Sequence, residues 1–503
     1  MSTLAIDVGT THCKAGLYAL DGAALAIASR PTPRARTAAG AVVFSPEALW
    51  QAVAAVVAEV LAAAGGRAVA AVGVASMAET GLLVDRRSGE PLTPLLPWFD
   101  QGAAPQAARL AREAPGLAGF GAFGLHPSFK CGLAKLLQAR ELWPAARGGL
   151  WLSAADFVAH RLCGAFGTDY SLAGRSFAFR LREGAWDAAW LRQLGLRADS
   201  FPPALPGGAP LGRTAAVAGL PPGVPVTICG HDHVCAAVGA GVAAPGTAFD
   251  SMGTAEALVG AVAEPALDEA AMGSGLTFGP LPLAGGHYWM GGLSASGGSL
   301  DWLRAILGDP PLSYAELGRL ASELGPGPGD LLYLPYLAGS GSPTPNPAAR
   351  GAFVGLRAGH TRADLLRAVL EGTAYQLEGM RRAAEGVTGA PIERIVAAGG
   401  GSRDRAWLQI KADVYGLPIA ALVADEATLR GAALVAGAGC GLYGGPAEAL
   451  AVAVGQASAP IAPDEARHRA YAAHYEAEFR PWSRLVALGQ PGGALAGADA
   501  PPS

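Results

Sequence analysis

The chain is 503 residues long, with 51% hydrophobic residues, 16% charged residues and a formal net charge of −4. At about 100–200 residues per domain this length predicts two to four domains, and the composition excludes a disordered chain. The near-neutral charge gives no basic surface for nucleic acid, so no nucleic acid is expected as a partner.

The first predicted unit is a β-hairpin with a polar turn. The runs Thr3–Val8 and Lys14–Leu20 flank Gly9-Thr10-Thr11, a pattern that favours two strands over a helix. A helix is expected from Pro46 to Ala64, because a cap residue, a first-turn proline and a first-turn acid open it. The uncharged stretch Val69–Ala75 then predicts a buried strand, and the alternation indicates an α/β fold.

A similar unit begins near residue 226. We expect a strand at Val226–Cys229, a turn at Gly230–His233 and a helix of small residues at Val234–Gly241. The next strand, Thr247–Gly253, ends in glycine and threonine, like the first hairpin. Two related domains facing one ligand would explain this similarity, whereas two unrelated turns are the alternative.

Further landmarks follow in the second half of the chain. The expected helices are Arg362–Thr388, Arg405–Tyr415 and Thr428–Gly437, together with one that begins at the serine- and glycine-rich turn in Ser294–Leu303. Ile395–Ala398 is expected to be a strand, and Gly339–Asn346 is a proline-rich loop. The tail Gly489–Ser503 is rich in glycine, alanine and proline, and we expect it to be disordered.

The expected compartment is the cytoplasm. The most apolar stretch, Ala52–Ala64, is interrupted by Glu59 and is shorter than the roughly 20 residues that cross a bilayer, so no membrane partner is expected. Asp7 lies inside the only apolar segment at the N-terminus, which is unlike a signal peptide. The six cysteines form no C-x-x-C pair and are expected to be reduced thiols.

Asp7 and the turn that follows it are the first candidate site. Glycine lets a ligand approach the backbone closely, and such turns can cradle phosphate oxygens. Because the carboxylate would repel phosphate, its natural role is to hold a magnesium ion. An ordinary hairpin with a polar turn is the alternative.

The glycine triplet Gly399-Gly400-Gly401 before Ser402 is a second place for close approach, to a flat group such as adenine. A tight connection between a strand and a helix is the alternative. It matches neither the G-x-x-x-x-G-K-[ST] phosphate loop nor the G-x-G-x-x-G fingerprint.

His231-Asp232-His233 allows three interpretations. Since successive strand residues point to opposite faces, a metal site would need the two histidines and a distant third ligand. A lone acid at a strand-to-helix turn is better suited to accepting a proton from a bound hydroxyl. Asp232 could also simply cap the following helix.

Several segments in order resemble the FGGY carbohydrate kinases, the group of glycerol, xylulose, gluconate and fuculose kinases. The resemblance runs from Leu4 to about Tyr443. It is carried by AIDVGTTHCKAGLYALDG, TDYS, GHDHVCAAVGAGV, SMGTAEAL, SASGGSLDWL, LLYLPYLAGSGSP, RGAFVGL, AAGGGSRDRAWLQIKADVYGLPI and ATLRGAALVAGAGCGLY.

The resemblance implies an α/β fold of two ribonuclease-H-like domains of the actin–hexokinase type, with ATP and sugar meeting in the cleft between them. The expected division is an N-terminal domain at 1–245 and a nucleotide-binding domain at 246–488, with a hinge near 242–246 and the tail at 489–503. Asp232 falls at the family's catalytic base, and Asp7 at the carboxylate associated with Mg²⁺. Positions expected at the nucleotide or its phosphates are Thr10, Thr11, Gly253, Thr254, Gly297, Asp301, Gly400, Gly401 and Asp404. Lys14 is expected to be scaffolding.

Sugar contacts are expected at Ala78, Glu79, Asp100, Lys130, His231 and His233. Glycerol kinases carry Arg-Glu where Ala78-Glu79 stands, and xylulose kinases carry Met-His, so neither pattern is complete. Glycine also replaces the arginine of the family's W-x-D-x-R stretch, which begins here at Trp98.

The resemblance therefore predicts an ATP- and Mg²⁺-dependent kinase of a small sugar or polyol, with a ketopentose such as xylulose first and other ketoses, polyols and sugar acids next. Dimers are common in the family, so a homodimer is the expected assembly. The rival classes are a nucleotide-dependent regulatory protein on the same fold and a metal hydrolase built on His231 and His233.

Overall fold

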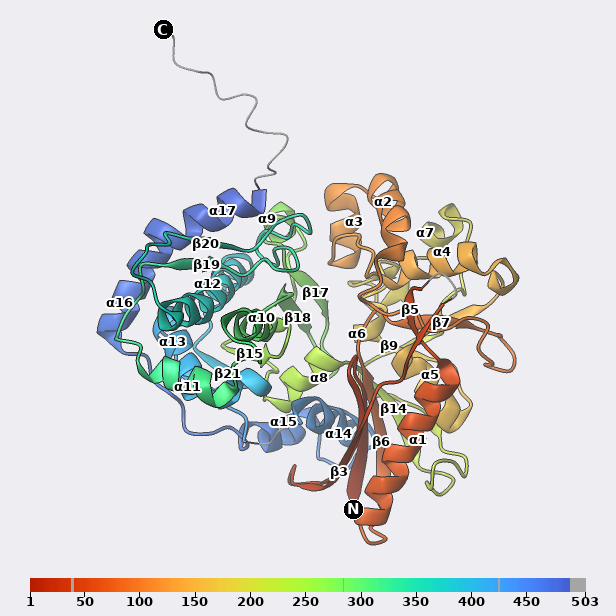
Figure 1. The fold of residues 1–503 in the computed structure, drawn as a ribbon. Helices are drawn as coiled ribbons and strands as arrows, with labels where there is room; N and C mark the ends of the chain where they lie inside the picture. Colours follow the sequence, from red (N-terminus) through yellow and green to blue (C-terminus); the bar gives the residue numbers. More distant parts are fainter. Residues whose placement is uncertain (38–39, 284, 424–425, 489–503) are drawn as a thin grey trace.

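The computed structural model describes residues 1–37, 40–283, 285–423 and 426–488. It forms two lobes, each built around a six-stranded mixed sheet (Figure 1). The predicted disordered tail at 489–503 lies outside the described residues.

The N-terminal sheet has the strand order β13-β14-β6-β1-β2-β3. β1 pairs antiparallel with β2 and parallel with β6, and β6 pairs parallel with β14. The strands are β1 (Ser2–Val8), β2 (His12–Ala19), β3 (Ala24–Pro31), β6 (Val69–Ser76), β13 (Pro210–Arg213) and β14 (Pro225–His231).

The C-terminal sheet has the order β17-β18-β16-β15-β21-β22 and repeats this pattern. β15 pairs antiparallel with β16 and parallel with β21, so the predicted similarity between the two units extends to their topology. The strands are β15 (Thr247–Met252), β16 (Glu256–Val262), β17 (Thr277–Pro280), β18 (His287–Leu293), β21 (Arg394–Ala398) and β22 (Ile419–Ala421).

Smaller two-stranded pairs lie outside these sheets. They are β4 (Arg34–Arg36) with β5 (Val42–Phe44), β7 (Gly81–Val84) with β8 (Leu150–Ser153), β9 (Thr168–Asp169) with β12 (Ala204–Leu205), β10 (Phe179–Arg180) with β11 (Ala185–Trp186), and β19 (Leu332–Leu334) with β20 (Ala352–Val354).

The helices cover the sheets and form the lobe edges. They are α1 (Pro46–Ala63), α2 (Ala104–Glu113), α3 (Gly116–Phe123), α4 (Gly132–Leu142), α5 (Ala154–Cys163), α6 (Tyr170–Ala173), α7 (Ala188–Gln193), α8 (Asp232–Gly239), α9 (Glu269–Gly273), α10 (Gly297–Leu307), α11 (Tyr314–Ser322), α12 (Arg362–Thr388), α13 (Arg405–Tyr415), α14 (Ala427–Gly439), α15 (Pro446–Val454), α16 (Glu465–His474) and α17 (Arg480–Leu488).

The predicted helix at α1 forms because Ser45 accepts a hydrogen bond from Ala48 and Pro46 begins the first turn. It is the one helix, within the described ranges, whose length and composition would suit a membrane span. Its apolar face is buried in the same core as β1 and β2, and Glu59 forms an ion pair with Arg30 of β3. These contacts are typical of a core helix.

Two helices, α8 and α14, lie between the sheets (Figure 1). Cys235 and Val238 of α8 join a core with the N-terminal strands, whereas Val234 and Ala237 join one with the C-terminal sheet. α14 comes from the second half of the chain, yet it packs on β1 and β6. The N-terminal sheet is therefore completed by a helix from beyond residue 245.

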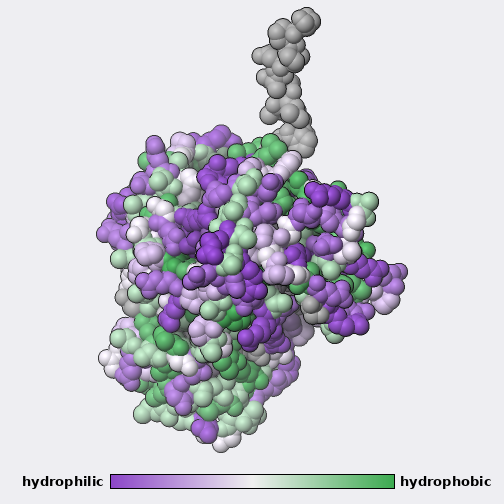
Figure 2. Space-filling view, turned by 90° about the vertical axis from the view of Figure 1, so that its left-hand side faces the viewer, coloured by the Kyte–Doolittle hydropathy of each residue, from purple (hydrophilic) through white to green (hydrophobic). Residues whose placement is uncertain are grey.

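The outer face of the C-terminal lobe is mostly hydrophilic in its upper part (Figure 2). Hydrophobic side chains gather lower in this view, toward the end of the molecule where α15, β3 and the N-terminus lie.

The predicted hairpin of β1 and β2 is confirmed, but the strand that follows it was not predicted, and one predicted turn is wrong. The first hairpin continues into a third strand, β3, whose largely exposed or half-buried residues lack a strong apolar pattern. The expected turn at Gly230–His233 does not exist, because β14 runs through His231 and α8 begins at Asp232. Gly230 has φ 115°, a conformation that favours glycine.

Candidate functional site

The carboxyl ends of three neighbouring strands bring the predicted N-terminal residues to one edge of the sheet. β1, β6 and β14 are parallel, with Asp7 beside Ala75 and His231 beside Ser76 in the register. Residues that end or directly follow these strands therefore lie together, as is typical of ligand sites in α/β sheets.

A cavity of about 330 Å³ opens at this edge and is walled by both lobes. It brings together seven predicted residues, namely Thr10, Ala78, Glu79, Lys130, His231, Asp232 and His233. Its other walls include Trp98 and Arg175, residues 255–257 of the second hairpin, Thr277, and Ser340–Ser342 of the proline-rich loop. We call it the cleft cavity.

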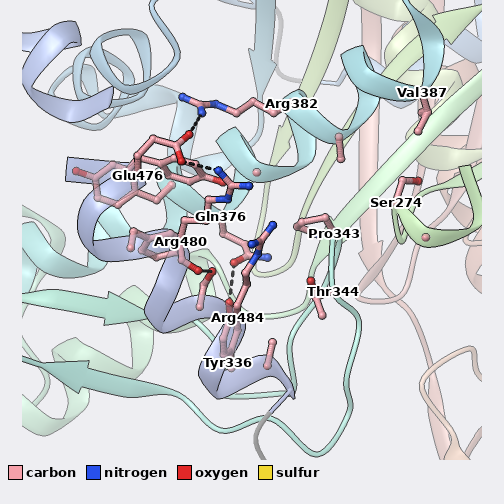
Figure 3. Close-up of a pocket in the computed structure, with 18 of the residues that line it drawn as sticks. Ser274, Tyr336, Pro343, Thr344, Gln376, Arg382, Val387, Glu476, Arg480 and Arg484 are labelled. Carbon is pink, nitrogen blue, oxygen red and sulfur yellow. Dashed lines mark hydrogen bonds and ion pairs between the residues drawn. The ribbon is translucent and has the colours of Figure 1, made fainter. Parts of the chain in front are cut away.

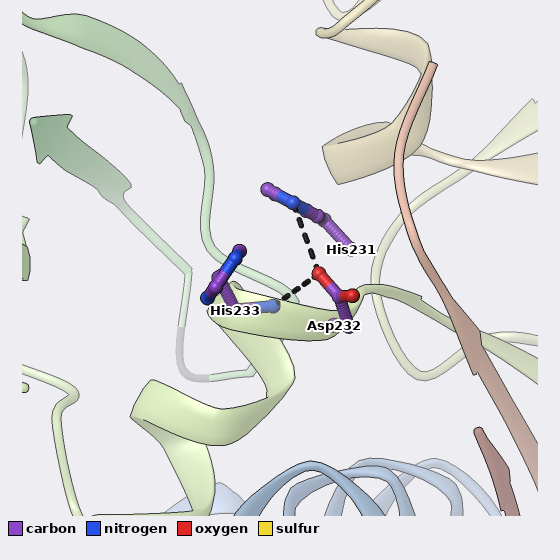
Figure 4. Close-up of side chains that lie close together, drawn as sticks. All are labelled: His231, Asp232 and His233. Carbon is purple, nitrogen blue, oxygen red and sulfur yellow. Dashed lines mark hydrogen bonds and ion pairs between the residues drawn. The ribbon is translucent and has the colours of Figure 1, made fainter. Parts of the chain in front are cut away.

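Asp232 is the first residue of α8, and its carboxylate is held by its neighbours. Its Oδ1 accepts hydrogen bonds from the backbone N–H of His233 at 2.7 Å and from Nε2 of His231 at 3.1 Å (Figure 4). Within the described ranges Oδ2 forms no hydrogen bond or ion pair, so it is available to a ligand. Burial alone would raise the pKa of Asp232, but His233 and His231 outweigh it and lower the pKa below its usual value. The carboxylate is therefore ionised near neutral pH.

The three side chains of His231, Asp232 and His233 also offer ligand atoms within 4.8 Å of one another (Figure 4). The expectation that a metal would need a distant third ligand is wrong, because the strand ends at His231 and the helical turn brings Asp232 between the histidines. A capping role for Asp232 is also wrong, since His231 is the N-cap and makes no side-chain capping bond.

A buried hydrogen-bond network holds the backbone of His231. The backbone N–H of His231 donates to Ser171 Oγ at 3.0 Å, and Ser171 Oγ donates to Asp169 Oδ1 at 3.0 Å. Asp169 also caps α6 by accepting from the N–H groups of Ser171 and Leu172. The TDYS segment thus supports the position of the strand end that carries Asp232.

Glu79 forms a buried ion pair with Arg175, a residue that the sequence did not single out. Arg175 donates to Glu79 through Nε at 2.8 Å and Nη2 at 2.5 Å, and through Nη1 to Thr277 of the other lobe at 3.0 Å. The backbone of Glu79 is in the left-handed region, with φ 59°, so the local turn sets the direction of its side chain. Burial would raise the pKa of Glu79, but Arg175 lowers it overall. Glycerol kinases carry an arginine where Ala78 stands. In this chain Arg175, from a different segment, places a guanidinium beside Glu79.

Lys130, Trp98 and Thr10 form the opposite wall. The Trp98 indole donates to Thr10 Oγ1 at 2.8 Å, and Lys130 Nζ lies 5.1 Å from the Trp98 ring centre, within cation–π range. Burial lowers the pKa of Lys130, although Glu79 opposes this.

Asp100 is placed differently. Its Oδ2 accepts from Gln138 at 3.1 Å, its carbonyl accepts from Lys135, and it does not line the cleft cavity.

The two threonine hairpins present unbonded backbone donors. No hydrogen bond is formed, within the described residues, by the backbone N–H groups of Thr10, Thr11 and Thr254. The turn at Gly253 also packs closely on the start of α10, because a Cβ at Gly297 would lie 2.6 Å from the Gly253 carbonyl oxygen. Both hairpins therefore have backbone donors of the kind that a phosphate site needs.

The Asp7 carboxylate has the properties of a cation ligand. Its Oδ1 is buried and has no hydrogen-bond partner in the described part of the chain. Burial and the nearby Asp232 raise the pKa of Asp7, and a divalent cation would relieve both effects. Lys14 forms a salt bridge with Glu426 at 2.7 Å instead of pairing with Asp7, and so joins β2 to the start of α14.

A buried ionic cluster anchors the second hairpin. Lys411 on α13 pairs with Asp250 of β15 at 2.7 Å and with Glu256 of β16, and all three side chains are fully buried. Glu256 also accepts a hydrogen bond from Ser296, the N-cap of α10. One cluster therefore holds both strands of the hairpin and the helix packed against it.

The remaining predicted nucleotide residues lie at the edge of the C-terminal sheet. Residues 399–402 follow β21, and Gly399 and Ser402 line a cavity of about 440 Å³. Asp404 caps α13 by accepting from the N–H groups of Ala406 and Trp407. Asp301 is exposed on α10 and bonds with Arg304 and Tyr314. Gly400, Gly401, Asp301 and Asp404 do not line the cleft cavity.

Comparison with known proteins gives a consistent picture. The model of the FGGY family of carbohydrate kinases, N-terminal domain, matches residues 2–239, and that of the C-terminal domain matches 249–440. A glycerol kinase from Geobacter sp. (strain M21) is 31% identical, with 87% of this chain and 90% of that protein covered. A xylulose kinase from Bacillus subtilis (strain 168) is 27% identical, with 88% of each covered. The crystal structure of a xylulose kinase from Rhodospirillum rubrum superposes with a TM-score of 0.86 at 28% identity, covering 96% of this chain and 99% of that one.

Proposed function

Because the chain belongs to the FGGY family of carbohydrate kinases, and is thus an ATP-dependent phosphotransferase, we propose that it phosphorylates a hydroxyl of a ketopentose such as xylulose, with Asp232 as the general base. The observation that carries this proposal is the position of Asp232, which lines the same cavity as Thr10.

The proton transfer would run from the sugar hydroxyl to Asp232. A base must be ionised and within hydrogen-bond reach of the hydroxyl it activates. The lowered pKa of Asp232 supplies the first condition, and its half-buried place in the cleft cavity supports the second. His231 and His233 hold Oδ1, so the carboxylate is oriented before substrate binds.

Phosphoryl transfer needs alignment and charge neutralisation more than covalent help from the protein. The free N–H groups of Thr10, Thr11 and Thr254 would bind the phosphate oxygens from two sides. Asp7 would hold Mg²⁺, which when bound neutralises phosphate charge. The cluster of Lys411, Asp250 and Glu256 keeps the second hairpin in register.

A ketopentose suits the sugar side of the cavity better than glycerol does. At about 330 Å³ the cavity has the size of a small-molecule site. Glu79 is oriented by Arg175, and His233 and Lys130 add polar contacts. Xylulose kinases are among the relatives. Other ketoses, polyols and sugar acids are the next candidates.

The direct test is an ADP-release screen of the purified protein with ATP, Mg²⁺ and a panel of ketoses, aldoses, polyols and aldonates. We expect xylulose to give the highest kcat/KM. A preference for glycerol or an aldonate would replace the ketopentose assignment. Slow ATP hydrolysis that no sugar stimulates would instead support a nucleotide-dependent regulatory protein.

One observation favours a second candidate, a metal hydrolase, because His231, Asp232 and His233 are clustered. Elemental analysis of the purified protein distinguishes it: a hydrolase requires zinc at one equivalent per chain, whereas the kinase requires none.

A further inference from the structure

A second cavity, of about 470 Å³, lies in the C-terminal lobe, and none of the predicted sugar or phosphate residues lines it (Figure 3). It is enclosed by α12, α17, the loop 339–346 and the π-helical turn Tyr475–Phe479. π-Helical turns are rare and occur frequently at functional sites. We call it the C-terminal cavity.

Its charged residues leave one cation without a partner. Glu476 accepts from Arg382 and, at 2.6 Å, from Arg480. Arg382 also donates to Glu378 at 2.5 Å. Arg484, one turn after Arg480 on α17, faces the cavity but pairs with no carboxylate of the described ranges. The cavity therefore keeps net positive charge, and guanidinium groups suit phosphate well.

The rest of the cavity lining is largely aromatic and can pack against the organic part of a ligand. Tyr336, Tyr375, Tyr475 and Phe479 contribute aromatic surface, and Gln376 contributes an amide. A few charged groups on an otherwise apolar and aromatic wall are typical of small-molecule sites. The matching ligand is an organic phosphate monoester whose carbon body packs on the aromatic rings.

The same loop walls both cavities. Pro343 and Thr344 line the C-terminal cavity, whereas Ser340–Ser342 line the cleft cavity. Figure 3 shows Pro343 and Thr344 on this loop, facing the helix that carries Arg480 and Arg484.

Side-chain hydrogen bonds connect this loop to the walls of the C-terminal cavity. Asn346 donates from Nδ2 to the carbonyl of Ala487 on α17 at 2.6 Å. Gln376 donates to the Ser342 carbonyl at 2.6 Å and accepts from Tyr336 at 3.0 Å. A movement of α17 toward a bound anion would therefore reach the cleft through the loop.

We propose that the C-terminal cavity is an effector site for organic phosphate monoesters, and that α17 and the loop 339–346 transmit its occupancy to the cleft.

The binding test uses phenyl phosphate, a monoester with an aromatic ring. Inorganic phosphate, which has no organic group, is the comparison. Calorimetry is done on the full chain with saturating Mg²⁺ and ADP, so that the phosphate positions of the cleft are filled. We expect one site, with phenyl phosphate bound more tightly than inorganic phosphate. Arg484→Gln should weaken binding by roughly tenfold or more, since a charge-assisted hydrogen bond is lost. Arg469→Gln, an exposed arginine on α16 that lines neither cavity, should bind like the wild type.

The coupling test measures sugar phosphorylation with and without phenyl phosphate. We expect a change of about fivefold or more in the KM for sugar. Arg484→Gln should keep the basal rate and lose the response. Asn346→Ala should keep phenyl phosphate binding but lose most of the response.

Absence of binding, or equal binding by the wild type and Arg484→Gln, would overturn the proposed site. Binding without any kinetic effect would overturn the transmission. Neither outcome bears on the kinase assignment, because basal phosphorylation is measured without effector.

Discussion

At the scale of single residues, Arg175 shows how one side chain can serve a pocket and an interface together. It neutralises Glu79 in the cleft cavity and donates to Thr277 on the opposite lobe. The side chains of Arg175 and Glu79 are only 12% and 8% exposed, so neither charge could be solvated alone.

We therefore expect Arg175→Met to lower the free energy of unfolding by about 3–5 kcal/mol, because it leaves Glu79 buried and unpaired. Sugar KM should rise as well. Thr277→Val removes two hydrogen bonds, one accepted from Arg175 and one donated to the Met290 carbonyl, and should cost about 1–2 kcal/mol. Urea denaturation of both variants is the measurement, and equal losses in the two would contradict the role given to the ion pair.

Sequence reasoning located Asp232, Glu79 and Thr10 through the family's motifs, but it missed Arg175. The reason is physical: Arg175 meets Glu79 across 96 positions of the chain, and no local pattern reports such a contact. The TDYS segment was noticed, yet only the structure shows that Ser171 binds the backbone of His231.

At the scale of elements, the two central helices depend on glycine. α8 and α14 cross so closely that a Cβ at Gly431 would lie 1.7 Å from the Cys235 carbonyl oxygen. Gly386, near the end of α12, has open space around the same position. The same substitution should therefore have opposite effects at these two sites.

Gly431→Ala should lower the free energy of unfolding by about 1–3 kcal/mol through overpacking. Gly386→Ala should raise it by about 0.5–1 kcal/mol, because alanine is the better helix former. Thermal unfolding measures both. A neutral Gly431→Ala variant would mean that the helices do not approach as closely as described.

Glu371 on α12 makes the stability depend on pH. Burial raises its pKa from 4.5 to about 7, although Gly329 and Tyr471 donate hydrogen bonds to it. A raised carboxyl pKa favours folding fully below the unfolded value of about 4.5. That contribution, about 3 kcal/mol, is lost as the pH rises to 7 and stays lost above it.

Glu371→Gln should remove this dependence. We expect unfolding free energies measured between pH 4.5 and 8 to fall less steeply in the variant than in the wild type, with the variant at least as stable at pH 8. Parallel curves for the two proteins would show that Glu371 does not titrate in this range.

Regular elements were predicted best where local chemistry marks both ends. α12 begins after a capping box of Thr361 and Asp364 and ends at Gly389 in a left-handed conformation, and both ends were predicted correctly. β3 was missed because an exposed edge strand needs no apolar alternation.

At the scale of the whole molecule, the two sheets share a topology, and residues of both lobes line the cleft cavity. The similarity between the Thr10 and Thr254 turns suggested two related domains from the sequence, and the structure confirms that the topologies of the two sheets match. The crossing of α14 onto the N-terminal sheet could not be predicted, because it depends on contacts between the two ends of the chain. The division at residue 245 and the hinge at 242–246 stay predictions.

The central claim is that Asp232 accepts the proton of the attacking hydroxyl. Asp232→Asn keeps the size of the side chain and removes its basicity, so we expect sugar phosphorylation to fall by about 10²–10⁴-fold, while ATP binding and the unfolding temperature stay near wild type. Asp199→Asn, on the surface beside Arg197, is the matched control and should keep full activity. The measurement is kcat for the best sugar together with ATP affinity by calorimetry. Turnover within about threefold of wild type in Asp232→Asn would contradict the account.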